Sequence, residues 1–371
     1  MNNPLPGGAR VKYAERTEAL MFLKNCWYVA AWASEVGDRP LARTICGEPI
    51  ALFRTVAGAY VALDDRCCHR NLPLSMGTIE GEALRCGYHG LKFDTNGRCI
   101  EIPGQKQIPS GARVASYPVV ERWGMLWIWP GAAPADESLL PHWDGLDDPR
   151  LVRSNGNGEK PLAMRCNWQL NNDNLLDLSH VFYVHKSTLG APGMENLPIK
   201  SSRSNRGVSM SRWMPNTAPI PLFTQYLGLK DGQMMDRWQG TDAELPTHCL
   251  IHAGFAPAGA LSPDDMAGRD KYIRFHAFIT ATPETANSSF MFYVQARNFA
   301  HENTALTERI VGDFRTVFGE DIAVMEGQQR VNERAPEAPT VDVSWDGPPL
   351  AMRRLLAERM AAETAEKTAG P

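Results

Sequence analysis

The chain has 371 residues, of which 43% are hydrophobic and 22% are charged, and its formal net charge is −4. These values are typical of a soluble globular protein of two domains, and they give no support to nucleic acid or an anionic membrane surface as a partner. No apolar run approaches the length of a membrane span, and residues 1–20 lack the apolar core of a secretion signal. We therefore expect a cytoplasmic enzyme.

The N-terminal part is predicted to form short strands joined by turns. Two pairs of short apolar runs each flank a turn signal, Gly58 in the first pair and Asn96-Gly97 in the second: 50–54 with 59–63, and 91–94 with 98–102. Residues 124–130 form a further apolar strand pattern. We predict an antiparallel β domain over 20–135, and a linker rich in Ala, Pro, Asp and Gly over 131–160.

The C-terminal part, 136–371, combines helical and strand patterns. A helix is predicted at about 168–184, another at about 304–330, and a third from about Leu350 that frays toward the end of the chain. Between the first two helices the pattern predicts four strands: 203–212, 248–254, 272–280 and 288–297.

Two motifs in the N-terminal part combine cysteine with histidine: Cys67-x-His69 and Cys86-x-x-His89. In a long chain without a secretion signal, such cysteines favour metal binding over disulfides. Thiolate and imidazole together suit zinc or an iron–sulfur cluster, and two imidazoles on one iron of a [2Fe–2S] cluster define the Rieske type. A structural zinc site is the alternative, although zinc fingers usually pair their histidines on one helix. The spacing favours the cluster and leaves Cys68 outside the ligand set.

A second polar group lies on the first predicted helix. Four polar residues recur every three positions among apolar neighbours: Asn171, Asn174, Asp177 and His180. Buried polar groups need partners or a metal, so this stripe predicts a site inside the protein. His185 follows His180 by five residues, and both can share one ion only if the helix loosens or ends between them. A π-type turn would achieve this.

Two histidines and a carboxylate are typical ligands of a mononuclear non-heme iron. The helix predicted at 304–330 offers four candidate acids: Asp313, Glu320, Asp321 and Glu326. Its apolar face is defined by Ile310, Phe314, Val317, Val324 and Met325. Asp321 falls in the middle of this face, where a carboxylate is costly unless it binds something. We predict Asp321 as the third ligand, and interpret Glu320 as an N-cap or solvated acid.

With these motifs in place, the chain resembles the oxygenase component of Rieske non-heme iron oxygenases. It is most similar to the branch that contains vanillate O-demethylase, dicamba monooxygenase and toluenesulfonate methyl monooxygenase. The resemblance runs from about residue 24 to residue 353 and includes these stretches: 85–91, 103–105, 121–131, 236–239, 296–299 and 321–330. Cys68 stands where this family usually has proline. Tyr88 stands where the disulfide-stapled Rieske proteins of respiratory complexes have cysteine.

The resemblance implies an α+β architecture, with an all-β Rieske domain at 20–135 and a helix-grip catalytic domain at 136–371. It implies a cluster held by Cys67, His69, Cys86 and His89, and a mononuclear Fe(II) held by His180, His185 and Asp321. It further implies a homotrimer in which Asp177 links His180 of one subunit to His89 of the next. Asn174 matches an asparagine near the iron.

The implied function is that of the terminal oxygenase of a multicomponent Rieske monooxygenase. It would use O2 to hydroxylate or oxidatively O-demethylate a small aromatic acid such as a methoxybenzoate, with electrons from NAD(P)H through a flavin and ferredoxin-type reductase. The alternatives are a Rieske dioxygenase and a hydroxylase of another scaffold, such as a steroid or alkaloid. A Rieske electron carrier without oxygenase activity is the alternative from a different class, and the second site argues against it.

The motifs do not disclose the substrate. Four residues could line an apolar pocket, with core packing as the alternative for each: Trp213, Phe223, Met234 and Met235. Arg297 could meet a substrate carboxylate, although a structural salt bridge is the more ordinary interpretation.

Overall fold

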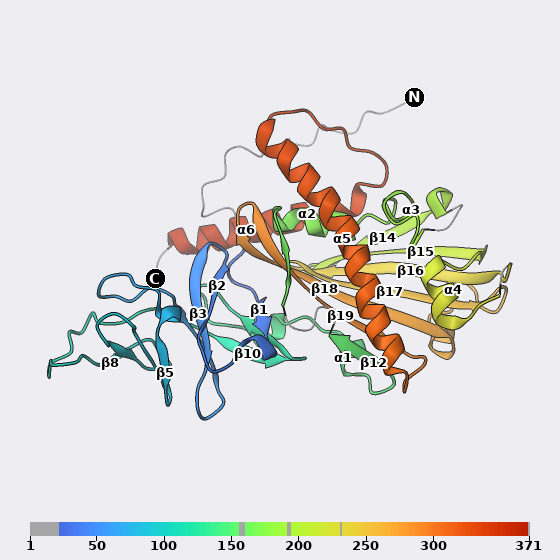
Figure 1. The fold of residues 1–371 in the computed structure, drawn as a ribbon. Coiled ribbons are helices and arrows are strands. Elements are labelled where there is room, and N and C mark those ends of the chain that lie inside the picture. The colour runs from blue at the N-terminus through green and yellow to red at the C-terminus, as the bar shows by residue number, and fades with distance from the viewer. Residues whose placement is uncertain (1–21, 156–159, 191–193, 231, 370–371) are drawn as a thin grey trace.

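The computed structural model describes residues 22–155, 160–190, 194–230 and 232–369. Its N-terminal part consists of three small antiparallel sheets (Figure 1). The first has the order β1 (Tyr28–Trp32), β11 (Met125–Ile128) and β10 (Val119–Arg122). The second has the order β2 (Leu41–Ile45), β3 (Glu48–Arg54), β4 (Tyr60–Asp64) and β9 (Ser116–Tyr117). The third has the order β5 (Thr78–Glu80), β6 (Ala83–Arg85), β7 (Lys92–Phe93) and β8 (Cys99–Glu101).

Both predicted hairpins are confirmed. Strand β3 pairs with β4, and β7 pairs with β8. Gly58 and Gly97 occupy the turns with φ of 94° and 73°, a left-handed conformation that glycine adopts without steric cost. A Cβ at Gly97 would lie 2.3 Å from the Val114 carbonyl oxygen, so this turn also needs glycine for space.

The C-terminal part is built on one large antiparallel sheet. Its order is β12 (Val152–Asn155), β19 (Ser288–Arg297), β18 (Ile273–Thr285), β17 (His248–Pro257), β16 (Met235–Glu244), β15 (Gly207–Thr217) and β14 (Ile199–Arg203), and β13 (Leu162–Met164) also pairs with β19. The long helix α5 (Thr304–Arg334) lies across this sheet in Figure 1. Helix α2 (Trp168–Leu175) contacts both α5 and α6 (Gly347–Ala369). The predicted α+β architecture is thus confirmed, while the division near residue 135 stays a prediction.

The buried side of α5 explains why the sheet wraps onto it. The helix buries Ile310, Phe314, Val317, Phe318, Asp321, Met325 and Gln329. Val324, predicted on this face, is 41% exposed, so that assignment was wrong. None of the described helices is both long enough and apolar enough to cross a membrane.

Several predicted elements differ from the structure. The strand predicted at 203–212 crosses a turn between β14 and β15, where the Ser204 N–H donates to the Gly207 carbonyl over 2.9 Å. Strand β16 was missed, and the predicted linker contains β12. Helix α6 begins before Leu350 and continues to Ala369 without the predicted fraying.

The helix predicted at 168–184 is interrupted. Helix α2 ends at Leu175 and a single turn, α3 (Val181–Val184), follows. Between them the Asp177 carboxylate accepts from the Ser179 N–H at 2.7 Å and from its hydroxyl at 2.6 Å. Such local side-chain bonds compete with the helical pattern, which accounts for the break.

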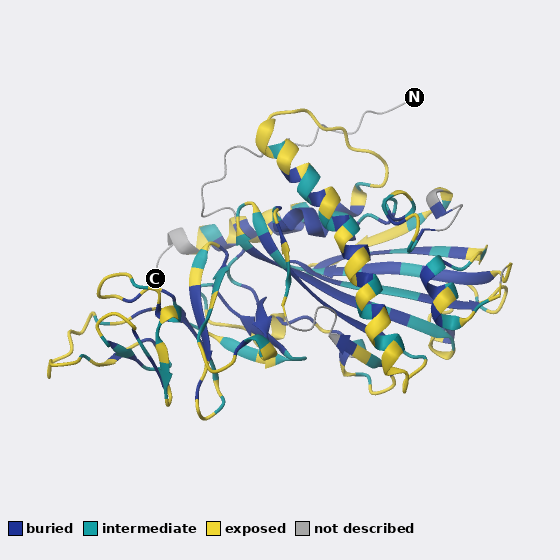
Figure 2. Cartoon of the chain, viewed as in Figure 1, coloured by how far each residue is buried: buried dark blue, intermediate teal, exposed yellow. Residues whose placement is uncertain are grey.

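The two parts of the chain are joined by buried contacts. The His248 Nε2–H donates to the Trp27 carbonyl over 3.2 Å, and the Thr282 hydroxyl donates to the Val29 carbonyl over 2.6 Å. An aromatic cluster that includes Trp127, Trp143 and Phe278 packs around this junction. Figure 2 shows the sheet strands behind α5 as largely buried.

His248 should make the stability of this junction depend on pH. Complete burial lowers the pKa of His248 to about 3. The unfolded chain binds a proton below about pH 6.5 and the folded chain does not, so acid favours unfolding across this interval. Between pH 7 and pH 5, this residue should remove about 2 kcal/mol from the free energy of unfolding.

The test is urea unfolding of wild type and His248→Gln at both pH values. The substitution should reduce the loss between pH 7 and pH 5 by roughly that amount. His142→Gln, at an exposed position, is the control and should leave the pH dependence unchanged. An equal pH dependence in all three proteins would contradict this role for His248.

Candidate metal centres

The two cysteine–histidine motifs fold into similar loops, one after β4 and one between β6 and β7. Each loop is closed by the N–H of its cysteine, which donates to the carbonyl of a leucine five residues later: Cys67 to Leu72 at 2.9 Å and Cys86 to Leu91 at 2.8 Å. The residue before each leucine has a left-handed backbone: Asn71 with φ of 57° and Gly90 with φ of 75°. The repeated geometry brings two loops distant in sequence to equivalent positions around one site.

The four predicted ligands divide into an inner and an outer pair. Cys67 and Cys86 are buried, whereas His69 and His89 are exposed, with ring centroids 4.5 Å apart. Burial, together with the neighbouring Cys86, raises the pKa of the Cys67 thiol to about 11. A thiol of this kind loses its proton when a metal binds, so the inner pair is suited to become thiolate ligands.

This arrangement fits a two-iron cluster better than zinc. A single zinc would draw its donor atoms to within about 4 Å of one another. Among the described residues, these four side chains do not form a group of three or more whose ligand atoms all lie within 4.8 Å of one another. A cluster with one iron on two thiolates and one on two imidazoles spans a wider space.

Two residues beside the predicted ligands stay outside the ligand set. Cys68 is exposed, and Tyr88 contacts the His89 ring, with the two ring centroids 3.8 Å apart.

The second site lies where α3 meets α5. His180 precedes α3 and His185 follows it. The suggested π-type turn is not present. The Val184 N–H donates to the His180 carbonyl at 2.9 Å, and the His185 N–H donates to the Val181 carbonyl, as in an ordinary α-helical turn. The helix nevertheless ends at His185, and the two imidazoles approach each other from the two ends of one turn.

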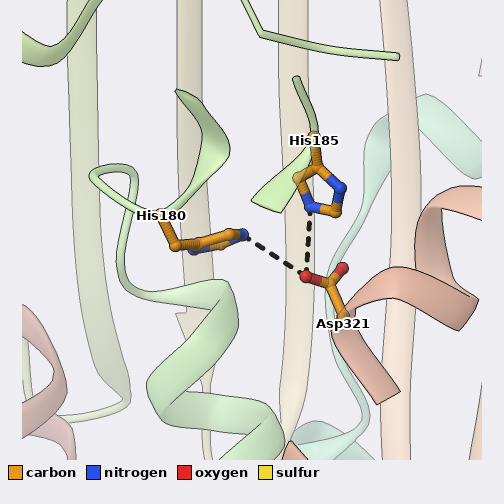
Figure 3. Close-up of side chains that lie close together, drawn as sticks. All are labelled: His180, His185 and Asp321. Carbon is orange, nitrogen blue, oxygen red and sulfur yellow. Dashed lines mark ion pairs between the residues drawn. The ribbon is translucent and has the colours of Figure 1, made fainter. Parts of the chain in front are cut away.

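Asp321 of α5 completes this group (Figure 3). Its Oδ1 lies 3.1 Å from His185 Nε2 and 3.5 Å from His180 Nε2. The three ligand atoms lie within 4.8 Å of one another, and Asp321 is only 4% exposed. Two imidazoles and a carboxylate that converge in this way could hold a divalent iron.

Glu320 contributes to the same site, which the sequence interpretation missed. Its Oε2 lies 2.7 Å from His185 Nδ1 and accepts from the Thr188 hydroxyl at 3.2 Å. The expected N-cap or solvated role was therefore wrong. A carboxylate on the outer nitrogen of a metal-binding histidine orients the ring, and adjacency to Asp321 is the signal that could have suggested it. Asp313 instead accepts from the Tyr226 hydroxyl, and Glu326 accepts from the Arg165 N–H.

The two histidines differ in their electrostatic surroundings. Burial lowers the pKa of His180, and the attraction of Asp321 only partly offsets this. Burial also acts to lower the pKa of His185, but hydrogen bonds and charge from Asp321 and Glu320 outweigh it, so the pKa is raised. The carboxylates thus create a negatively charged recess that favours a cation.

Asn174 and Asp177 flank the trio. The Asn174 Nδ2–H donates to Asp321 Oδ1 at 3.2 Å. Asp177 Oδ2 lies 4.0 Å from His180 Nδ1, and that nitrogen is buried without a hydrogen-bond partner among the described residues. Asp177 Oδ1 is occupied by Ser179, so one oxygen alone faces His180.

A cavity opens beside this trio. Strands β16, β17 and β18 and helix α5 form its walls, and Phe223 of α4 (Pro221–Leu227) is the only one of the four predicted pocket residues on it. Met235 is packed in the core, Met234 is exposed, and Trp213 stacks on Trp238. Arg297 is structural, but not through the expected salt bridge: among the described residues its guanidinium donates to the Phe299 carbonyl and the Thr307 hydroxyl, and it forms no ion pair.

Two domain families match this chain. Residues 26–118 match the Rieske [2Fe-2S] domain, and residues 164–362 match the vanillate O-demethylase oxygenase C-terminal domain.

Curated relatives and a solved structure agree with these matches. The chain is 37% identical over 347 residues to a vanillate O-demethylase oxygenase subunit of a Pseudomonas species, covering 92% of this chain and 96% of the relative. It is 36% identical over 335 residues to the iron–sulfur subunit of the toluene-4-sulfonate monooxygenase system of Comamonas testosteroni, covering 88% and 93%. The crystal structure of dicamba monooxygenase bound to 3,6-dichlorosalicylic acid superposes with a TM-score of 0.83 at 29% identity, covering 93% and 99%.

The geometry predicts different effects for the two adjacent acids of α5. Asp321→Ala should abolish iron binding, because it removes the atom on which both imidazoles converge. Glu320→Ala should weaken iron affinity by roughly 10- to 100-fold, because His185 loses its orienting partner. Iron retained against a graded chelator measures both effects.

The control is Glu326→Ala on the same helix, whose carboxylate serves the Arg165 N–H. It should bind iron like wild type. All three variants should keep the visible spectrum of the cluster. Wild-type iron affinity in Glu320→Ala would contradict the orienting role, and iron retention in Asp321→Ala would contradict the trio.

Proposed function

Because this chain belongs to the Rieske non-heme iron oxygenases of the vanillate O-demethylase type, we propose that it O-demethylates or hydroxylates a small aromatic acid such as a methoxybenzoate. The chain is the oxygenase component of a multicomponent monooxygenase, with a Rieske [2Fe–2S] cluster and a mononuclear iron as cofactors. The observation that carries the proposal is the apolar cavity that opens directly beside His180, His185 and Asp321.

We assign the cluster to Cys67, His69, Cys86 and His89, and the iron to His180, His185 and Asp321. When bound, these groups supply single electrons and activate O2 for attack on a C–H bond. The side chains of the protein hold the ligands and shape the space. Glu320 fixes the His185 ring, Asn174 donates to Asp321, and the aromatic walls exclude water from the reacting carbon.

A separate reductase of the flavin and ferredoxin type, using NAD(P)H, is the proposed electron source, and the cytoplasm is the proposed location. The proposed assembly is a ring of three subunits. In it the exposed His89 of the partner subunit meets Asp177 beside His180. Support comes from the exposure of His89 and from the unpartnered Nδ1 of His180 next to Asp177 Oδ2.

A dioxygenase, or a hydroxylase of another scaffold, is the second candidate within the class. The cavity favours a small ring over a steroid or alkaloid, because five phenylalanines line it: Phe223, Phe255, Phe275, Phe314 and Phe318. A simple electron carrier would have no use for a buried histidine–carboxylate trio beside an apolar cavity.

The reaction should release formaldehyde from aryl methyl ethers. Purified protein with both metals, a surrogate reductase and NADH should convert a methoxybenzoate into the corresponding phenol. The amounts of formaldehyde and phenol formed should each equal the amount of O2 consumed. If a panel of methoxybenzoates and methylated aryl acids yields neither formaldehyde nor hydroxylated product, while NADH still reduces the cluster, the proposed substrate class is wrong.

Asp177→Asn tests the proposed link between the two centres. The amide has nearly the same shape, but it presents an N–H where a carboxylate oxygen would accept from His180. The variant should bind both metals, remain a trimer by light scattering, and reoxidise its reduced cluster far more slowly with substrate and O2. Ser179→Ala is the control, since it removes one bond to Asp177 Oδ1 and leaves Oδ2 in place. If Asp177→Asn reoxidises its cluster at the wild-type rate, Asp177 has only a structural role.

A further inference from the structure

Arg237 is a buried cation on the wall of the cavity. It lies on β16, whose residues Arg237, Gln239 and Thr241 alternate along the face that lines the cavity. It pairs in register with Phe255 of β17, and its guanidinium carbon lies 5.6 Å from the centre of that ring. The side chain is only 4% exposed, so the cavity is its route to any ligand.

The hydrogen bonds of Arg237 are incomplete. Its Nη1–H donates to the Ala218 carbonyl at 3.1 Å, but its Nε–H is buried without a partner in the part of the chain that the structure describes. Over the same residues, no carboxylate forms an ion pair with it. The neighbouring charge is that of Arg212, which is repulsive.

Arg297 on β19 shows how a buried structural arginine in this sheet satisfies its hydrogen-bond donors. It is equally buried, at 2% exposed. Its guanidinium donates to four acceptors: the carbonyls of Phe299, Ala300 and Asn303, and the hydroxyl of Thr307. Arg237 has one such acceptor, so a purely structural role leaves most of its donors unexplained.

Burial without an anion is costly for a cation. Burial, with the repulsion of Arg212, lowers the pKa of Arg237 to about 9, so the side chain is still charged at neutral pH. A buried charge that has neither an ion pair nor a full set of hydrogen bonds destabilises the empty site. An oxyanion in the cavity would remove this penalty, and guanidinium binds such a group through two parallel N–H bonds.

We propose that Arg237 binds the carboxylate or sulfonate of an aromatic substrate and makes the enzyme selective for aryl oxyanions. The phenylalanine walls then hold the ring, and the anion lies on the β16 wall rather than on the metal. The Thr241 hydroxyl, fully buried and without a partner among the described residues, is a further donor on the same strand. The inference deepens the proposed function and rests on it only for the aromatic nature of the ligand.

Binding can be measured without turnover. Holoenzyme with both metals, kept anaerobic and without an electron donor, is titrated by calorimetry with 4-methoxybenzoate, 4-methoxybenzenesulfonate and the neutral 4-methoxybenzamide. Wild type should bind an anion at least about tenfold tighter than the amide. Arg237→Met should weaken anion binding by at least about 30-fold, as expected when one partner of a buried charge pair is removed, and should leave amide binding nearly unchanged.

Two further variants assign the cause. Arg237→Lys keeps the charge and should retain part of the anion preference. Arg269→Met removes an arginine that lies over the rings of Trp213 and Trp238 and is absent from the cavity wall, and it should keep the full preference. The benzoate and sulfonate titrations show which oxyanion the site prefers.

The outcomes separate this inference from the proposed function. Unchanged anion binding in Arg237→Met, or equal loss of the amide and the anions in both Arg237 variants, would overturn the role of Arg237. Neither result bears on formaldehyde release by wild type. Conversely, a wild type that binds aryl anions through Arg237 but yields no product would overturn the proposed reaction and leave the binding role intact.

Discussion

The structure of the catalytic centre depends on one buried carboxylate. Asp321 stands among apolar residues on the sheet-facing side of α5, and both imidazoles converge on its Oδ1. This burial is tolerable only with a cation or donors at hand, and the chain supplies His180, His185 and the Asn174 amide. The single helical turn α3 has His180 at its start and His185 at its end, and the rings of both reach Asp321. The interruption after α2 lets this turn take a direction of its own.

The parts of the site that could be predicted from sequence are those encoded over short distances. The spacing of Cys67 with His69 and of Cys86 with His89 lies within two loops, and helical phase alone placed Asp321 on the buried face of α5. Glu320 was interpreted as an N-cap or solvated acid because helical phase favoured Asp321, and its role at the site depends on where α3 places His185. The role of Arg237 was missed for a similar reason. Nothing in the neighbouring sequence distinguishes Arg237 from Arg297, and only the tertiary structure shows which of the two arginines has a full set of hydrogen-bond acceptors.

The same contrast between local and tertiary signals holds for the fold. Hairpins with a glycine turn and the long amphipathic helix were correctly predicted, because each signal is complete within a few residues. Strand β16 was missed because its sequence, with Asp236, Arg237, Gln239 and Asp242, does not look apolar. Arg237 and Gln239 line the cavity, whereas the Asp236 carboxylate accepts from the N–H groups of Asn216 and Gly259. Polar residues with cavity-lining and structural roles thus concealed this strand.

The charges around the cavity have a consequence for how a substrate would lie in it. The carboxylates of Asp177 and Asp321 line the cavity beside the two histidines. On the β16 wall, Arg237 carries one positive charge at neutral pH. An aryl carboxylate in the cavity is attracted to Arg237 and repelled by the two carboxylates. This matters because a carboxylate is itself a good iron ligand, and one that reached the ion would compete with O2. In the proposed binding mode, Arg237 would hold the anion on the β16 wall and away from the metal, in an apolar space where the attraction is only weakly screened.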